Sequence, residues 1–256
     1  MDEQQWRRFL GHYHDTHAGI TEQLLTLAEP LPYAWLAEPL HTTDGIVVDL
    51  ACGSAPTRAL LPDTPWVGVD SSAGELAEAA RRGRLPLIRA SADALPLRSG
   101  TVGAVCASMC LPVLTPLPRV LDEIRRVLRP GGTLAVLVPS QSGLTPSGAL
   151  AWIRVMTALR AVHQPWPNPQ ARDQLAALLG ELGFAVRADE HRVFTLRLDT
   201  PEATALLVDG LYLPRLTPHR AQAAKRALAA WARPGRRIEL PLRRVIAERP
   251  IASASG

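Results

Sequence analysis

Short apolar runs alternate with amphipathic segments along the first half of the chain. Two amphipathic segments, 72–82 and 117–128, repeat apolar residues at helical spacing, and Pro130-Gly131-Gly132 ends the second. Strand–helix alternation of this kind predicts right-handed crossovers and a parallel α/β sheet. The apolar runs have the length of strands buried on both faces of such a sheet, and they are 46–50, 66–70, 87–89, 102–109 and 133–138.

The remaining segments predict helices around this core. The segment 3–28 repeats apolar residues near helical spacing, and Ser72 with Glu75 predicts a capping box for the helix at 72–82. The second half predicts helices at 148–163, 175–182, 201–212 and 218–232, and strands at 193–198 and 238–247. No repeat or low-complexity linker divides the chain, so we expect one domain. Its parts are a helical segment at 1–43, a core at 44–139, and substrate-side helices with the last strands at 140–256.

Composition narrows the class of protein. Hydrophobic residues make up 47% of the chain, but no apolar run reaches the roughly 18–20 residues that span a membrane. The start, Met1-Asp2-Glu3-Gln4-Gln5, lacks the basic and apolar parts of a secretion signal, so we expect a cytoplasmic protein. The cysteines are odd in number and lie in apolar surroundings, which predicts buried free thiols; they are Cys52, Cys106 and Cys110.

The net charge of +4 does not predict a nucleic-acid partner. The arginines are dispersed along the chain in pairs such as Arg81-Arg82 and Arg236-Arg237, and Lys225 is the only lysine. A surface that follows phosphates needs its basic residues gathered in one dense stripe. We therefore expect no nucleic-acid partner, and the lack of a long apolar run predicts no membrane partner, while the oligomeric state stays open.

Small and acidic residues follow the first three predicted strands. Asp49 opens the stretch Asp49-Leu50-Ala51-Cys52-Gly53-Ser54-Ala55-Pro56 after the first strand, Asp70 ends the second, and Asp93 follows the third. Ligands of open parallel sheets bind outside the carboxyl ends of the strands, where an acid after the second strand accepts hydrogen bonds from ribose hydroxyls. A carboxylate after the third strand can accept a bond from an exocyclic amine. The three positions together suit an adenosine ligand.

These segments resemble the class I S-adenosylmethionine (AdoMet)-dependent methyltransferases, of the small-molecule "methyltransferase type 11" kind. The resemblance covers roughly residues 44–139 and is carried by four segments, Val48–Gly53, Gly68–Ser72, Asp93–Pro96 and Glu123–Gly132. It implies AdoMet as cofactor. It also implies a Rossmann-like α/β fold with a mostly parallel, seven-stranded sheet, an antiparallel last strand, an N-terminal helix and extra lid helices.

The resemblance also implies individual cofactor contacts. Asp49 is implied to anchor the amino group of the methionine moiety, Asp70 the ribose, and Asp93 with Ala94 the adenine. The other implied contacts lie in the loops after the strands and on the N-terminal helix, and they are Ala51, Cys52, Gly53, Ser71, Ser108, Met109 and Tyr13. Where the family loop reads Gly-x-Gly-x-Gly, this chain has alanine at 51 and 55. An alanine with a positive φ costs about 1 kcal/mol or more.

Several of these residues also have plain structural interpretations. Asp49 and Asp70 can serve as caps, Asp93 as a turn residue, and the cysteines as small core residues. The histidines of the N-terminal helix, His12, His14 and His17, lack the Asp, Glu or Cys partners of a metal site, so we expect no metal. Four aromatic residues of the second half fit either a substrate pocket or the core, namely Trp152, Trp166, Tyr212 and Trp231.

The function predicted by the resemblance is methyl transfer to a small molecule at an undetermined O, N, C or S atom. No catalytic base can be picked from the sequence. Two alternatives stay open: a relative that binds AdoMet without methylating, in a pericyclic or structural role, and an RNA methyltransferase. A dehydrogenase is disfavoured, because Pro56 and Thr57 occupy the place of the last glycine and Asp49 would repel a pyrophosphate.

Overall fold

The computed structural model describes residues 1–251, and within them the strands form one eight-stranded sheet in the order β1-β7-β8-β6-β5-β2-β3-β4. The strands are β1 (Ala28–Glu29), β2 (Val47–Leu50), β3 (Trp66–Asp70), β4 (Leu87–Arg89), β5 (Val102–Ser108), β6 (Leu128–Pro139), β7 (Ala185–Arg197) and β8 (Arg237–Glu248). The helices are α1 (Glu3–Thr16), α2 (Ile20–Leu25), α3 (Pro32–Ala37), α4 (Ala73–Arg81), α5 (Leu117–Val127), α6 (Pro146–Leu159), α7 (Gln170–Asp173), α8 (Leu175–Glu181), α9 (Pro201–Asp209) and α10 (Pro218–Ala229). Short 3₁₀ turns cover Glu38–Leu40 and Pro56–Leu60.

The sheet confirms the predicted mixed Rossmann-like architecture. Strands β4, β3, β2, β5 and β6 pair in parallel, and the last strand, β8, pairs antiparallel with β6 and β7. One strand more than the expected seven is present, because Ala28 and Glu29 pair with Leu196 and Thr195 of β7. Two residues before a proline give no strand pattern, so β1 was not predicted.

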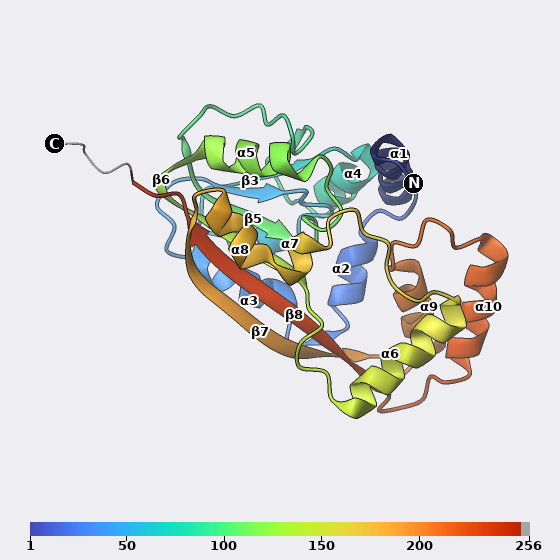
Figure 1. Ribbon diagram of the computed structural model, residues 1–256. Coiled ribbons are helices and arrows are strands. Elements are labelled where there is room, and N and C mark those ends of the chain that lie inside the picture. The colour runs from blue at the N-terminus through green and yellow to red at the C-terminus, as the bar shows by residue number, and fades with distance from the viewer. Residues whose placement is uncertain (252–256) are drawn as a thin grey trace.

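Helices cover both faces of the sheet. Adjacent strand residues point to opposite faces, so Val47 packs in one core cluster with α3, and Val48 packs in the other with α5 and α8. Helices α6, α9 and α10 gather with α2 at one end of the molecule, next to the carboxyl ends of the parallel strands (Figure 1). The expected extra helices therefore stand beside the edge where ligands bind.

The predicted helix at 3–28 is wrong as a single element. Helix α1 ends at Thr16, and α2 begins at Ile20 after a bend in which Gly19 has a φ of +77°. The bend has a long-range cause, since the Gly19 N–H donates to the buried carboxylate of Glu75, 2.8 Å away. Glycine adopts this left-handed conformation without steric penalty.

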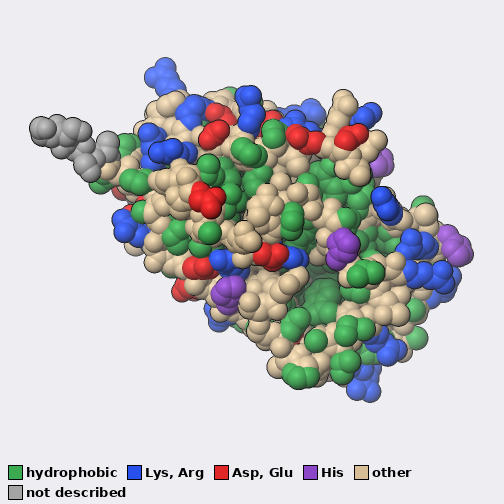
Figure 2. Space-filling model, in the orientation of Figure 1, with side chains coloured by type: hydrophobic (Ala, Val, Ile, Leu, Met, Phe, Trp, Pro, Cys, Tyr) green, Lys and Arg blue, Asp and Glu red, His purple; other side chains and the backbone are tan. Residues whose placement is uncertain are grey.

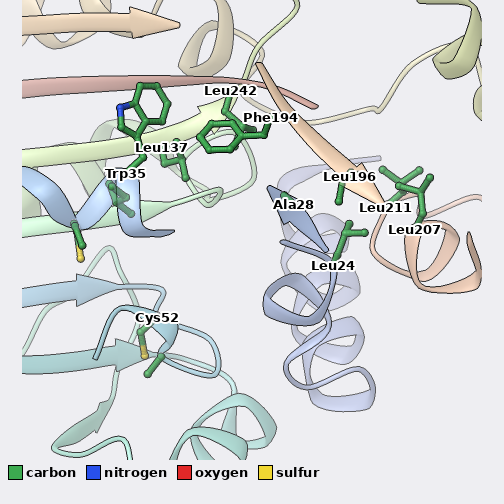
Figure 3. Close-up of a cluster of buried hydrophobic side chains, with 14 of the residues drawn as sticks. Leu24, Ala28, Trp35, Cys52, Leu137, Phe194, Leu196, Leu207, Leu211 and Leu242 are labelled. Carbon is green, nitrogen blue, oxygen red and sulfur yellow. The ribbon is translucent and has the colours of Figure 1, made fainter. Parts of the chain in front are cut away.

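One buried cluster fixes the helices at the ligand-binding end to the sheet (Figure 3). Trp35 of α3 lies against Phe194 of β7, with ring centroids 5.6 Å apart. At the far end of the same cluster, Leu24 of α2 lies near Leu196 of β7 and Leu207 of α9 (Figure 3). Each such leucine contributes about 1.5–3 kcal/mol by leaving water. The cluster thus holds α2 and α9 rigidly beside the sheet.

A search of residues 1–251 finds no helix with both the length and the apolar character needed to cross a membrane.

Candidate functional site

A cavity of about 220 Å³ opens at the carboxyl ends of β2, β3 and β5. The following predicted site residues line it: Asp49, Ala51, Cys52, Gly53, Asp70, Ser71, Ser108 and Met109. We call it the first cavity. Three predicted contacts, Tyr13, Asp93 and Ala94, are outside its lining.

Asp49 is a deeply buried acid of the first cavity, with 2% of its surface exposed. Burial raises the pKa of its carboxyl from 3.8 to about 7, the neighbouring charge of Asp70 acts in the same direction, and hydrogen bonds from Thr57 and Cys106 oppose the rise. The Thr57 hydroxyl donates to Oδ2. No basic residue of the described chain pairs with this carboxylate, so a cationic ligand group would relieve its desolvation.

Asp70 is held by two backbone N–H groups. Its Oδ2 accepts from Gly53 and its Oδ1 from Ser72, each at 2.8 Å. These bonds lower the pKa of Asp70, but burial outweighs them and raises it above its ordinary value. Each carboxylate oxygen has further lone pairs, so the side chain can accept two more hydrogen bonds from a ligand in the cavity.

The loop between β2 and the Pro56–Leu60 turn is strained. Ala51 and Ala55 have φ values of 51° and 57°, and Gly53 lies between them with a φ of 55°. Both alanines therefore occupy the left-handed region that favours glycine, at about 1–2 kcal/mol each. Strain of this kind persists only where the surrounding structure fixes the backbone.

Helix α2 supplies that support through Glu22, a buried acid that the sequence analysis did not single out. Its carboxylate accepts hydrogen bonds from Ser54 Oγ at 2.6 Å, from Arg82 at 2.8 Å and from both terminal nitrogens of Arg84 at 2.7 and 2.8 Å. Arg84 also donates to the Ser54 carbonyl at 2.7 Å. The network joins α2, the end of α4 and the strained loop into one unit.

The N-terminal helix presents His14, rather than Tyr13, to the first cavity. The Tyr13 hydroxyl donates to the Asp209 carbonyl, and its ring stacks on His17 with centroids 4.9 Å apart. Burial raises the pKa of Tyr13 well above its usual range. Neighbouring positions on a helix point about 100° apart, so His14 lines the cavity while Tyr13, the contact implied by the resemblance, points elsewhere.

Glu75 does not close the predicted capping box. Ser72 does cap α4, accepting the Glu75 N–H at 3.2 Å. The Glu75 carboxylate instead faces His14 Nδ1 and the Gly19 N–H, each at 2.8 Å, and Asp15 accepts the Ser72 hydroxyl at 2.7 Å. The carboxylate was assigned to the wrong partner because its true partners are far away in sequence.

Asp93 lies beside the first cavity, where Arg7 of α1 donates to it at 2.8 Å. Burial acts to raise the pKa of Asp93, but hydrogen bonds from Ser91 and Arg7 outweigh it and hold the pKa below its usual range. Ser91 and Ala92 line the cavity at this strand end. The loop after β4 thus reaches the cavity two residues earlier than the sequence predicted.

Ser108 ends β5 and Met109 follows it, and both residues line the first cavity. The buried Ser108 Oγ has no hydrogen-bond partner among residues 1–251, so it is free to meet a ligand atom. Met109 has a φ of 59°, and its N–H donates to the Leu137 carbonyl at 2.7 Å. This strained turn places the Met109 side chain against a neighbouring space.

That space is a second cavity of about 210 Å³, between the sheet and the helices at the ligand-binding end. Thr21, Met109 and Tyr212 line both cavities and form their junction. Trp152 and Trp166 add aromatic walls, and Figure 2 shows a hollow with hydrophobic side chains in this region. Three of the four aromatic residues considered from sequence thus meet here. The fourth, Trp231, lies beneath Arg154 and Arg236 instead.

A family model described as "Methyltransferase domain" matches residues 48–136. The match spans β2 to β6 and every strand end that borders the first cavity. This part of the chain, residues 48–136, is similar to the methyltransferase domain family. The family match therefore agrees with the fold and confirms the predicted resemblance.

Two curated relatives that match this part of the chain carry methyltransferase names. The chain is 36% identical over 169 residues to a malonyl-[acyl-carrier protein] O-methyltransferase of Alcanivorax borkumensis, covering 62% of this chain and 54% of the relative. It is 34% identical over 155 residues to a demethylmenaquinone methyltransferase of Beutenbergia cavernae, covering 54% and 65%. The chain thus spans between half and two thirds of the length of these relatives.

Solved structures share the fold of the methyltransferase domain and of the helices around it. The [4+2]-cyclase SpnF superposes with a TM-score of 0.61 at 18% identity, over 95% of this chain and 96% of that one. At this identity the likeness concerns the fold alone.

The chemistry of the first cavity suits a cation. Glu22, Asp49, Asp70 and Glu75 line it together with Arg7, and Glu22 is paired with Arg82 and Arg84. Asp49 and Asp70 have no basic partner among the described residues, so their carboxylates would repel a pyrophosphate.

Proposed function

We propose that this chain transfers a methyl group from AdoMet to a small-molecule acceptor. The observation that carries the proposal is the pairing of two cavities at one junction. A cavity lined by carboxylates, which suits a cationic nucleoside, meets an aromatic cavity at Met109 and Tyr212. Methyl transfer needs donor and acceptor in line at such a junction, and positioning of this kind supplies much of the rate enhancement.

The residues of the first cavity fit AdoMet in this proposal. Asp49 would take the amino group, Asp70 the ribose hydroxyls, and the unpartnered Ser108 hydroxyl a polar atom close to the sulfonium. Loop residues 51–53 and Ser71 would pack along the cofactor. AdoMet, when bound, supplies an electrophilic methyl group. Adenine contacts fall to Ser91 and Ala92 at the lining, while Asp93 and Ala94 stay proposed contacts just outside it.

The second cavity is the proposed acceptor site. Its lining is mostly apolar and aromatic, and α6 and α9 contribute Trp152 and Leu207 to it. We propose that residues 140–251 set acceptor choice, while 44–139 hold the cofactor and 1–43 cover it. Small-molecule chemistry is supported by the demethylmenaquinone methyltransferase among the relatives. The three buried free thiols fit a cytoplasmic location.

Calorimetric titration with S-adenosylhomocysteine tests the cofactor site. Asp70→Ala removes the ribose acceptor and should weaken binding by about tenfold to a hundredfold, the equivalent of about 1.5–3 kcal/mol for hydrogen bonds to a charged group. Asp63→Ala, at an exposed position far from the cavity lining, is the matched control. Equal affinities for wild-type and Asp70→Ala would refute the ribose assignment.

Incubation with AdoMet labelled at the methyl group and a metabolite extract tests the transfer itself. The proposal predicts label in a small molecule and release of S-adenosylhomocysteine. Tight AdoMet binding without any transfer of label would favour the non-methylating alternative, and label in RNA would favour the RNA alternative.

A further inference from the structure

His14, which is partly exposed, pairs with the buried Glu75 in the lining of the first cavity. His14 Nδ1 lies 2.8 Å from Glu75 Oε1, and Glu75 is 2% exposed. The second oxygen, Oε2, accepts the Gly19 N–H at 2.8 Å, which fixes the carboxylate in place. A carboxylate beside Nδ1 selects the tautomer in which Nδ1 carries the proton. The Nε2 atom then holds the free lone pair, as in a base oriented by an acid.

The pair stands next to the junction of the two cavities. The His14 ring lies 5.6 Å from the Tyr212 ring, measured between centroids. Tyr212 and Thr21 line both cavities, and their hydroxyl oxygens are 2.9 Å apart. His14 therefore lines the first cavity next to Tyr212, one of the residues that a methyl acceptor reaching in from the second cavity would pass.

Other residues around the junction are poor bases. The described lining of the second cavity holds no Asp, Glu, His, Lys or Cys side chain. In the first cavity Asp49 and Asp70 are assigned to the amino group and the ribose of the cofactor, and Glu22 is paired with Arg82 and Arg84. Burial raises the pKa of the Cys52 and Cys110 thiols. An imidazole is the side chain best suited to accept a proton at neutral pH.

We propose that His14, oriented by Glu75, is the general base of methyl transfer, and that the acceptor is a phenol or enol. This inference rests on the proposed function. The acceptor O–H gives its proton to Nε2 of His14 as its oxygen bonds to the methyl carbon. The carbon–sulfur bond breaks with its electron pair on sulfur, and His14 later releases the proton to water. The products are a methyl ether and neutral S-adenosylhomocysteine.

His14→Asn is the diagnostic variant. Asparagine keeps an N–H donor near the place of Nδ1 and so preserves the bond to Glu75, but it removes Nε2. His12→Asn, on the exposed side of the same helix, is the matched control. Calorimetry with S-adenosylhomocysteine comes first, and all three proteins should bind within about threefold of each other.

The direct readout is ionisation of a bound phenol, which needs no turnover. The probe is 4-nitrophenol, whose phenolate absorbs visible light, added to each protein saturated with S-adenosylhomocysteine. Wild-type and His12→Asn should show more phenolate than free solution at the same pH, and His14→Asn should not. The pH profile of this signal also reports the charges that face His14, which are those of Glu75, Asp70 and Asp15.

Turnover gives the second readout. His14→Asn should lose about 10²–10⁴-fold in kcat with weakly acidic phenols, the usual contribution of a general base. The loss should be much smaller with 4-nitrophenol at a pH above the pKa of the free phenol, where it is ionised without a base. An equal loss with both phenols, unchanged phenolate signals in His14→Asn, or no binding of any phenol would overturn the inference. Failure of all three proteins to bind S-adenosylhomocysteine would instead overturn the proposed function.

Discussion

Asp49 is a residue at which stability and ligand binding oppose each other. Its carboxyl is fully buried, and burial raises its pKa from 3.8 to about 7, whereas an unfolded chain ionises it near its ordinary value. At a pH between these two pKa values, Asp49 is therefore protonated in the folded state and ionised in the unfolded state. Stability from this group is fully present below about pH 4 and is lost as the pH rises to about 7.

Asp49→Asn should therefore stabilise the free protein at pH 8. A neutral amide removes a buried charge, and we expect a gain of about 2–4 kcal/mol in the free energy of unfolding. The gain should vanish near pH 4. Urea unfolding at pH 4 and at pH 8 measures the change in the free energy of unfolding, and a loss of stability at pH 8 would contradict the raised pKa of Asp49.

Asp49→Asn should also bind S-adenosylhomocysteine at least tenfold more weakly than the wild type, because the variant loses the carboxylate that pairs with the amino group.

Ala51 offers a test of backbone strain. Its φ of 51° lies in the left-handed region, where glycine is free of the Cβ clash. Ala51→Gly should stabilise the fold by about 0.5–1 kcal/mol, measured by urea unfolding. The control Ala176→Gly, inside helix α8, should destabilise by about 1 kcal/mol. Equal losses in the free energy of unfolding for the two variants would show that the backbone at residue 51 is not strained.

At the scale of elements, the short helix α2 is held by charge as much as by apolar packing. Glu22 connects α2 to Arg82 and Arg84, which follow α4 in the sequence, and to Ser54 in the loop that carries Gly53. Six residues are too few for an isolated helix to be stable in water. The network and the leucines of Figure 3 therefore supply the stability that α2 lacks by itself.

Glu22→Gln should destabilise the protein by about 2–3 kcal/mol, because it leaves two arginines with a weaker partner in a mostly buried place. Thermal unfolding followed by circular dichroism measures the change. Glu29→Gln breaks exposed pairs with Arg197 and Arg237 and should change stability by less than about 0.5 kcal/mol. Similar effects of the two variants would mean that the Glu22 network is structurally neutral.

Elements with local signals were predictable from the sequence. The strand at 66–70 and the cap at Ser72 follow from apolar runs and from a hydroxyl before a helix, and the structure places both as expected. The break at Gly19 was not predictable, because a carboxylate 56 residues away causes it. The left-handed turn at Met109 likewise depends on a bond to Leu137 in another strand.

The candidate site likewise combines residues with local signals and residues without them. The meeting of Asp49 and Asp70 at one cavity was predictable, because strand ends of a parallel sheet converge at one edge. The place of His14 in the cavity was not predictable from the sequence, since only the long-range contact with Glu75 distinguishes it from His12 and His17 nearby in the chain.

At the scale of the whole molecule, the two cavities lie between the methyltransferase sheet and the helices at its carboxyl edge. A ligand in the first cavity touches α1, the β2 loop and β5 at once, so binding should stabilise the fold as a unit. S-adenosylhomocysteine at 100 times its Kd should raise the Tm by about 5–10 °C. ATP at the same concentration, with its phosphates facing the acids, should leave the Tm unchanged. An equal rise with ATP would contradict the charge argument.

A crystal structure with S-adenosylhomocysteine tests the central claim most directly. The account predicts electron density in the first cavity, with the ribose hydroxyls on Asp70 and the amino group within hydrogen-bond distance of Asp49. Density for the amino-acid end far from Asp49, or none at saturating ligand, would contradict it.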